Sequence, residues 1–553
     1  MLFSLVIAPS VLPLQQKPPP IEMKCRNSLL IVLNSYICPM RGPALIIALS
    51  ILVSRVLGVF REMLLARVAG INAEKNALDL AFMIPDILNS LVATGFLSII
   101  FIPIFTGYLV KNQEDRAWKF FANIINTLGV LMLVLIVPAW IYMREAILLF
   151  TTARPSPEVL ELSVHYGRII LPGQLAFFAG SFLVAVQYTR KQFLIPSLTG
   201  VIYNVAIIAG GWIGRKHGLD GFAWGVPIGA FVGFFALQLW GVMRGGLRWR
   251  PVFEVKDPDV RHYLKLMLPL MLGVGAMFAL EFVIKSFGSE FGTHGISALN
   301  YAYRLMYTLV AVFGFSVGVA SYPDMARMVK EGRLSDLNER VAGTVDRMFA
   351  ILIPAIAALW LLAFAATRIL FERGAFGREA TELVSELLRW YLPASIGLCT
   401  QAVLVRSFYA QERMWTPTLI NTGIFLASLA VYGPVAHVLG IKSVPLVGAC
   451  TSIIQVLTMG YIWQRLNGRA GLRKHTGNVL KSLLALALMG GALTWLGPIW
   501  DPILRELRLI SLVFTACVSG VLVFALTLGI EILLGNQSAR ALFSERLSRL
   551  KRK

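Results

Sequence analysis

Long apolar stretches separated by short polar segments run through most of the chain. Between residues 43 and 536 these stretches recur at about 20 residues each, the length a helix needs to cross the hydrocarbon core of a bilayer. Backbone groups in lipid must be hydrogen-bonded within their own segment, so the stretches predict helices. The period-two alternation of a membrane β-barrel is absent. The expected spans are 43–66, 77–109, 120–143, 159–188, 193–213, 221–243, 264–288, 295–326, 345–366, 380–410, 416–438, 444–464, 478–498 and 509–536.

An internal repeat organises these spans. A shift of 221 residues aligns anchors over about 50 residues, and six spans precede the shifted copy, so both copies keep the same orientation. The aligned pairs are Leu149-Phe150 with Leu370-Phe371, Arg168 with Arg389, Pro172 with Pro393, Tyr188 with Tyr409 and Pro196 with Pro417. We therefore expect an all-α polytopic membrane protein of about 14 transmembrane helices: two parallel six-helix lobes plus two C-terminal helices. Such repeats are typical of transporters that bind substrate between lobes.

The expected domain boundaries follow from this count. The N-lobe spans 40–250, the C-lobe 251–470, and the last two helices 471–536. A basic tail of residues 537–553 follows, which suits an anionic inner leaflet. Residues 1–39 are an extension with a proline run and without the basic start of a secretory signal. Either a start assigned too early, with Met40 as the natural beginning, or a disordered cytoplasmic extension explains it.

The composition and the charge agree with a membrane protein. The chain is 57% hydrophobic and 15% charged, whereas soluble domains carry about 25% charged residues. Its net charge of +21 does not indicate nucleic-acid binding, because the basic residues lie in and beside the loops. Counted with the N-terminus and with Lys265, Arg347 and Lys481 at the starts of their spans, alternate loops hold 32 Lys and Arg against 12 on the other side, and seven others lie inside spans. The positive-inside rule then places both termini in the cytoplasm and the protein in the inner membrane.

The sequence offers no metal, cofactor or catalytic motif. The five cysteines form no CxxC pair, and the six histidines have no ligand spacing. A nucleophile elbow and a P-loop are also absent. We expect neither a cofactor nor enzymatic activity.

Charged residues inside the spans are the candidate site, because each costs on the order of 2.5–3.5 kcal/mol at mid-helix. Arg55 lies near the middle of the first span and Arg61 nearer its end. Six residues turn a helix by about 240°, so the two arginines point about 120° apart and can line one wide cavity. Arg304 belongs to a polar stripe on an apolar helix. The other members of that stripe are Ser297, Asn300, Tyr301 and Thr308.

Other charges in the spans have simpler interpretations. Arg168, Arg389 and Arg406 fit snorkelling near helix ends, and the repeat symmetry of the first two favours a structural role. Glu281 and Lys285 are four residues apart and can pair on one helix face. Arginine suits phosphate because its planar fork donates two hydrogen bonds and stays charged. Arginines converging from both lobes would hold a pyrophosphate, whereas a cation-coupled drug exporter would need acidic residues.

Four segments at these positions resemble the MurJ (MviN) lipid II flippase family of the multidrug/oligosaccharidyl-lipid/polysaccharide exporter superfamily. The similarity runs from about residue 40 to 536. The segments are Ser54–Glu62 (SRVLGVFRE), Tyr301–Leu305 (YAYRL), Leu370–Phe376 (LFERGAF), and Phe408–Gln411 (FYAQ) with Thr416-Pro417.

The resemblance implies a substrate and a set of cavity residues. The family carries undecaprenyl-pyrophosphate-linked disaccharide-pentapeptide from the inner to the outer leaflet, in a cycle driven by membrane potential or an ion gradient. Its partners are this lipid-linked precursor and the surrounding membrane lipids, not nucleic acid. By resemblance, Arg55, Arg61 and Arg304 take the positions of the cavity arginines, and Ser297 that of the cavity serine.

Several positions depart from the family pattern. The family usually has an acidic residue at Asn76, and often arginine at Asn89 and glutamate at Thr94 and Tyr307. Lys285 adds a positive charge where the family tends to a neutral or acidic residue. Asp79 and Asp86 share a helical stripe with Asn76 and are candidates to compensate. We therefore count Asp79, Asp86, Glu281 and Lys285 as cavity charges.

Four functions are compatible with such a chain. The first is lipid II flipping by alternating access, and the second is export of another polyprenyl-pyrophosphate-linked glycan. The third, a drug or cation antiporter, is disfavoured by cavity arginines. The fourth, a membrane scaffold, is disfavoured by buried charge that would then have no use.

Overall fold

The computed structural model describes residues 42–92, 100–152, 154–190, 192–214, 216–277, 279–468 and 472–541. Every regular element in these ranges is a helix, which confirms the all-α prediction. The extension 1–39 and the tail beyond residue 541 lie outside the described residues.

The helices follow the expected spans closely. The continuous ones are α2 (Gly42–Ala69), α6 (Glu114–Ile141), α10 (Leu194–Ile213), α17 (Leu334–Leu361), α19 (Arg378–Ala410), α20 (Trp415–Leu439), α21 (Ser443–Asn467), α22 (Leu472–Glu506) and α23 (Leu509–Leu533). The span expected at 221–243 runs through α11 (Asp220–Gly229), η3 (Ala230–Ala236) and α12 (Leu237–Arg244). The span at 295–326 runs through α15 (Gly295–Leu309), η5 (Val310–Phe315) and α16 (Ser316–Lys330).

Some expected spans are interrupted. One contains α3 (Ala73–Ala81), α4 (Met83–Val92) and α5 (Ile102–Val110), and another contains α8 (Pro157–Ile170) and α9 (Gly173–Thr189). The span expected at 264–288 contains α13 (Pro258–Met277) and α14 (Ala279–Gly288), on either side of residue 278, which lies outside the described residues. Between α8 and α9 stands Pro172, which has no N–H to continue the helical hydrogen bonds. Hydropathy alone does not report such breaks. It also misses the polar first turns of α17, which begins at Leu334 rather than 345.

Nine helical stretches within the described ranges are long and apolar enough to cross a membrane, and two of them are long enough to contain two crossings. The chain is therefore a multi-pass membrane protein. The expected count of 14 spans stays a prediction.

The described chain forms two compact units. Within the described ranges, the first comprises residues 42–64, 84–143 and 165–271, and the second residues 65–83, 144–164 and 272–541. Compact units follow packing rather than chain order, so their division differs from continuous lobes at 40–250 and 251–470. Those lobe boundaries stay a prediction.

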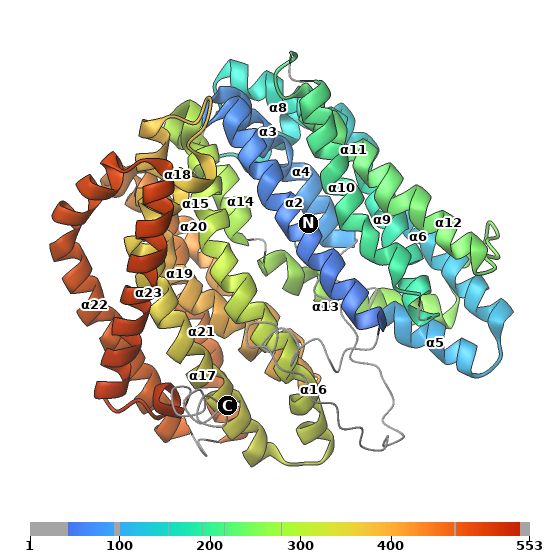
Figure 1. Ribbon diagram of the computed structural model, residues 1–553. Coiled ribbons are helices and arrows are strands. Elements are labelled where there is room, and N and C mark those ends of the chain that lie inside the picture. The colour runs from blue at the N-terminus through green and yellow to red at the C-terminus, as the bar shows by residue number, and fades with distance from the viewer. Residues whose placement is uncertain are drawn as a thin grey trace. The chain divides into compact units, whose positions relative to one another are not determined.

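Close packing of α10 against α11 holds much of the first unit together, and Figure 1 shows these two helices side by side. A Cβ atom at Gly225 of α11 would lie 2.6 Å from the Cα atom of Ile207 on α10. Only glycine permits this approach of two helix backbones, as is common where membrane helices pack. The packing fixes the face of α10 that carries Asn204.

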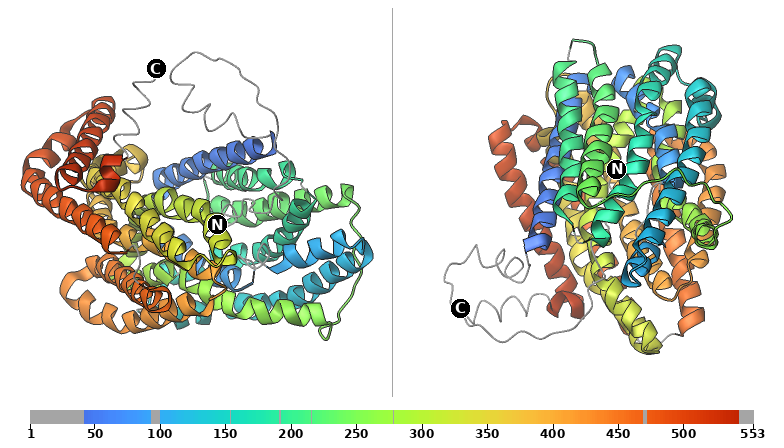
Figure 2. Two further views of the ribbon diagram at one scale, coloured as in Figure 1. Left: turned by 90° about the horizontal axis from the view of Figure 1, so that it is seen from below. Right: turned by 90° about the vertical axis from the view of Figure 1, so that its right-hand side faces the viewer.

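In the second unit, α22 and α23 pack on α17 and on α18 (Ala363–Phe371). One apolar cluster joins Ala357 and Leu361 of α17 to Met489 and Leu493 of α22 and Val523 of α23. Figures 1 and 2 both show α22 and α23, in red, next to each other. The two helices that lie outside the repeat thus belong to the packed core of this unit.

The two repeat copies share a contact at equivalent places. In the first unit, Arg168 Nε donates to the carbonyl oxygen of Trp140 at 3.2 Å, and its guanidinium lies 5.4 Å from the Trp140 ring. In the second unit, Arg389 Nε donates to the carbonyl oxygen of Trp360 at 3.3 Å, and its guanidinium lies 4.9 Å from that ring. Each arginine satisfies a carbonyl in the last turn of a 28-residue helix, α6 or α17. This geometry supports the structural role expected for both arginines.

Candidate functional site

In the first unit, the arginine-bearing face of α2 is organised by Asn204 of α10. The Asn204 Nδ2 group donates to the carbonyl oxygen of Gly200 at 2.8 Å and to the carbonyl and hydroxyl oxygens of Ser54 at 3.3 Å. Gly58, one turn after Ser54, faces Asn204: a Cβ there would lie at an ordinary contact distance of 3.9 Å from Asn204 Oδ1. These contacts fix the rotation of α2 and so the direction of its arginines.

Arg61 is already engaged by protein groups. Its Nη1 donates to Asn204 Oδ1 at 3.2 Å, while Nε and Nη2 donate to Glu62 Oε1 at 3.3 and 2.7 Å. The two charged side chains are 19% and 11% exposed. A guanidinium neutralised by an adjacent carboxylate is a weaker anion ligand, so this geometry favours a positioning role for Arg61.

Arg55 has a different setting on the same helix. It is half-buried, whereas Val53 and Val56 beside it are 46% and 61% exposed. In a membrane-spanning helix those two valines face lipid or a cavity. Arg55 lies near the middle of the expected span, where a charge needs a functional or structural reason.

In the second unit, Asn76 of α3 caps the N-terminus of α15. Its Oδ1 accepts hydrogen bonds from the backbone N and the hydroxyl of Ser297, both at 2.7 Å, and its Nδ2 donates to the carbonyl oxygen of Gly292 at 3.2 Å. The first N–H groups of a helix have no partner within it, so this side chain supplies one from another helix. Ser297 is fully buried, and its hydroxyl serves this contact.

A buried ion pair lies beside the cap. Lys75 Nζ is 2.5 Å from Asp79 Oδ2 and 4.9 Å from the ring centroid of Tyr301 on α15. Both charged side chains are at most 5% exposed. Asp79 therefore neutralises Lys75, a residue that the sequence analysis missed. The spacing of four between them on a short helix was the available signal.

Arg304 lies on the more open part of the α15 stripe. The stripe divides along its length: Ser297 and Tyr301 are buried, Asn300 and Arg304 are half-buried, and Thr308 is exposed. The Thr308 hydroxyl donates to the Arg304 carbonyl oxygen at 3.1 Å, so the arginine side chain is not held by that contact. The arrangement leaves Arg304 as the charged member of the accessible part of this stripe.

The remaining candidate charges are spread over two helices. Asp86 on α4 belongs to the first unit and is half-buried. Glu281 and Lys285 on α14 belong to the second, where Glu281 is half-buried and Lys285 is 6% exposed. Their pairing and their place in a cavity stay predictions. Thr94 lies outside the described residues. Among the residues that the structure describes, no group of three His, Cys, Asp or Glu side chains could hold a metal ion.

Comparison with known proteins decides the family. The model of the family "Lipid II flippase MurJ" matches residues 65–516, which is most of the chain. The chain belongs to the lipid II flippase MurJ family. Among curated relatives, a probable lipid II flippase MurJ of Rhizobium tropici is 25% identical over 470 residues, covering 82% of this chain and 86% of the relative. The lipid II flippase MurJ of Burkholderia cenocepacia is 28% identical over 416 residues, covering 72% and 79%.

Solved structures show that the fold is shared more widely than the family. A structure of a lipid II flippase MurJ in an inward closed conformation has a TM-score of 0.71 and 21% identity, covering 87% of this chain and 98% of that one. An inward-facing multidrug transporter of the MATE family has a TM-score of 0.62 and 16% identity, covering 74% and 95%. The fold alone therefore does not separate MurJ-type flippases from drug exporters, and the family match does.

Proposed function

We propose that this chain is a lipid II flippase that moves the undecaprenyl-pyrophosphate-linked peptidoglycan precursor from the inner to the outer leaflet by alternating access. The family match over residues 65–516 carries the proposal. The polar headgroup passes through the protein, and the prenyl chain stays in lipid.

Arg304 and Arg55 are the proposed pyrophosphate ligands. A guanidinium donates two parallel hydrogen bonds to a phosphate and keeps its charge at any physiological pH. Each charge-assisted bond contributes roughly 1.5–3 kcal/mol. Arg61 orients α2 through Glu62 and Asn204, and Ser297 orients α15 through Asn76.

The finer features of the cycle belong to the same proposal. Both termini lie in the cytoplasm, and membrane potential or an ion gradient drives the return of the empty protein. The protein breaks no covalent bond, since flipping needs only binding and conformational change.

Expression in cells depleted of their own lipid II flippase tests the function. We expect both the full chain and residues 40–553 to restore growth, with labelled precursor reaching the outer leaflet. Purified protein in proteoliposomes should also move labelled lipid II and should not move a labelled phosphatidylcholine.

A matched control shows whether the loss of an arginine outside the expected spans impairs the protein. Arg248→Ala removes an arginine 58% exposed in a surface ion pair with Asp115 and should leave growth unchanged. Correct membrane insertion without growth or lipid II movement would contradict the proposal. Movement of a different polyprenyl-pyrophosphate glycan in the same vesicles would then identify the alternative substrate.

A further inference from the structure

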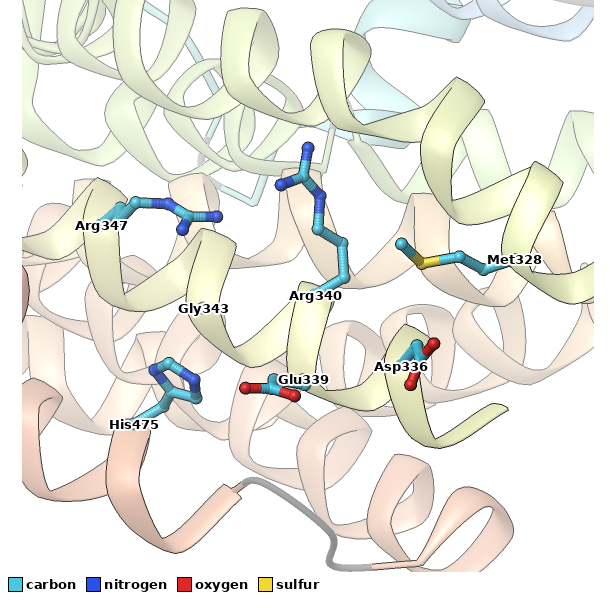
Figure 3. A pocket seen from close by; sticks show the side chains of 7 residues that line it. All are labelled: Met328, Asp336, Glu339, Arg340, Gly343, Arg347 and His475. Atoms are coloured by element: carbon cyan, nitrogen blue, oxygen red, sulfur yellow. The ribbon is translucent and has the colours of Figure 1, made fainter. Parts of the chain in front are cut away.

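A cavity of about 280 Å³ lies in the second unit. Its walls come from the end of α16, the first half of α17 and the start of α22. Figure 3 shows the seven lining residues: Met328, Asp336, Glu339, Arg340, Gly343, Arg347 and His475. We call this cavity the headgroup pocket.

One stripe of α17 forms most of the pocket. Residues 336, 340, 343 and 347 follow one another at intervals of three or four, and Glu339 lies four before Gly343, so all five share a face. Gly343 stands at the centre and creates the space. A Cβ atom there would lie 3.3 Å from His475 Cε1 and 3.5 Å from its Nε2.

Some of the charges in the pocket are already paired. Arg340 Nη2 lies 2.6 Å from Asp324 Oδ2, and Asp336 is held by Arg333 at 2.5 Å. Nearby, hydrogen bonds from Arg327 and Arg333 lower the pKa of Glu331, so that carboxylate is ionised and paired with these two arginines.

Two opposite charges remain available. Within the described ranges, neither Arg347 nor Glu339 has a hydrogen bond or an ion pair, and both side chains are exposed. Figure 3 shows the Arg347 and Arg340 guanidinium groups to one side of Gly343 and Glu339 to the other. A ligand with a negative and a positive group would satisfy both.

The third wall of the pocket is held rigidly. His475 Nδ1 donates to Asp346 Oδ2 at 2.8 Å, and Asn478 Nδ2 donates to the same oxygen at 2.9 Å. Asp346 is fully buried, so it fixes the imidazole in place. The Nε2 atom of His475 is left to line the pocket.

The pocket lies where three helices pass from charged to apolar sequence. Arg347 is the last charged residue of α17 before the uncharged run 348–361. On α16, Met328 comes after the uncharged run 305–323, and on α22 His475 precedes the apolar run 482–500. In a membrane protein this boundary is the depth of lipid headgroups.

We propose that the headgroup pocket binds a phospholipid with a zwitterionic amino-phosphate headgroup, of the phosphatidylethanolamine type. The phosphate contacts Arg347, and the primary ammonium donates hydrogen bonds to Glu339. A purely anionic headgroup would leave Glu339 facing negative charge. A phosphatidylcholine headgroup has the same net charge, but its quaternary ammonium has no N–H to donate.

Lipid titration of the purified full chain tests the proposal. Delipidated protein is mixed with phosphatidylethanolamine, phosphatidylcholine or phosphatidylglycerol of identical acyl chains, and bound lipid is counted by native mass spectrometry. We expect phosphatidylethanolamine to bind about tenfold more tightly than either of the others, which is the effect of one charge-assisted hydrogen bond. Soluble glycerophosphoethanolamine should compete only weakly, because it lacks the acyl chains that hold a lipid at this depth.

Two variants test the ammonium contact and the phosphate contact separately. Glu339→Gln should abolish the preference for phosphatidylethanolamine over phosphatidylcholine, whereas Arg347→Gln should weaken binding of all three lipids. Arg144→Gln and Glu158→Gln change exposed residues of α7 (Met143–Phe150) and α8 and should alter nothing. Equal or tighter binding of phosphatidylglycerol, or unchanged preference in Glu339→Gln, would overturn the proposal.

Discussion

Arginine on a membrane helix has different uses according to its neighbours, and three arginines of the predicted site illustrate this. Arg61 is paired with Glu62 and Asn204, and it lies nearer the end of the first span than Arg55 does. Arg55 is half-buried near mid-span, and Arg304 lies on the accessible part of a polar stripe. Sequence position identified all three as unusual, and the structure adds the contacts of Arg61 with Glu62 and Asn204.

The depth of these arginines in their expected spans gives a prediction for transport. Arg304→Ala and Arg55→Ala should each abolish flipping while the protein still accumulates in the membrane. Arg304→Lys should restore it only partly, since a point charge replaces a bidentate fork. Arg61→Ala should retain more activity than either. Growth of flippase-depleted cells and outer-leaflet labelling measure the effect, and full activity of Arg304→Ala would remove that residue from the site.

Asn76 provides a second prediction at this scale. Its side chain accepts two hydrogen bonds from Ser297 and donates one to Gly292, all within the second unit. Asn76→Ala leaves these groups unpaired and should cost about 2–3 kcal/mol of stability. Asn76→Asp keeps the acceptor and adds a negative charge at the N-terminus of α15, which the helix dipole favours.

The measurement is the thermal unfolding midpoint of purified protein in detergent. We expect Asn76→Asp to lie between the unchanged protein and Asn76→Ala. If Asn76→Ala unfolds at the same temperature as the unchanged protein, the cap contributes nothing to stability. This ordering would also explain how the position tolerates both an amide and the acidic residue typical of the family.

Among the elements, the paired arginine–tryptophan contacts connect sequence repeat to structure. Arg168 and Arg389 close α6 and α17 in the same way in the two units. The sequence could predict their equivalence, because the 221-residue shift that defines the repeat relates Arg168 to Arg389. It could not predict their tryptophan partners, since Trp140 and Trp360 are offset by 220 residues rather than 221.

The contribution of the arginine–tryptophan contact to stability can be measured. Arg389→Ala removes a charge-assisted hydrogen bond and a cation–π contact, which should cost about 2 kcal/mol of stability. Arg168→Ala should cost less, because that side chain is more exposed. Thermal unfolding and flipping should both be measured. A loss of flipping at unchanged stability in Arg389→Ala would mean that this arginine acts on substrate instead.

The helices themselves were the most predictable feature. Hydropathy located every long helix to within a few residues wherever polar ends did not extend it, as they do at Leu334 of α17. Breaks within spans were missed, because a residue such as Pro172 interrupts backbone hydrogen bonding without lowering local hydropathy. The candidate site was predicted only in part. Asn204 escaped notice because its importance arises from contacts between helices, whereas the spacing of four between Lys75 and Asp79 was a signal that went unused.

For the whole molecule, the distribution of basic residues between loops predicts the orientation of the chain in the membrane. A flippase must load its substrate from the leaflet where the precursor is made, so the orientation of the chain is part of its function. The bias of 32 to 12 basic residues between alternate loops is large enough that moving one loop between sets would not reverse it. An odd number of spans, however, would place the two termini on opposite sides.

Reporters fused at two exposed positions distinguish these arrangements. Val255 follows α12, and Thr293 lies in η4 (Ser289–His294), so α13 and α14 separate the two positions. If the span expected at 264–288 crosses the membrane once, a reporter active only in the cytoplasm should work near Val255 and fail near Thr293. The same reporter after Ala541 should work if the span count is even, as expected. Activity near Thr293 instead of Val255 would reverse the topology. Activity at both positions would mean that residues 264–288 do not cross, which would remove one helix from the second lobe and break the symmetry on which parallel lobes depend.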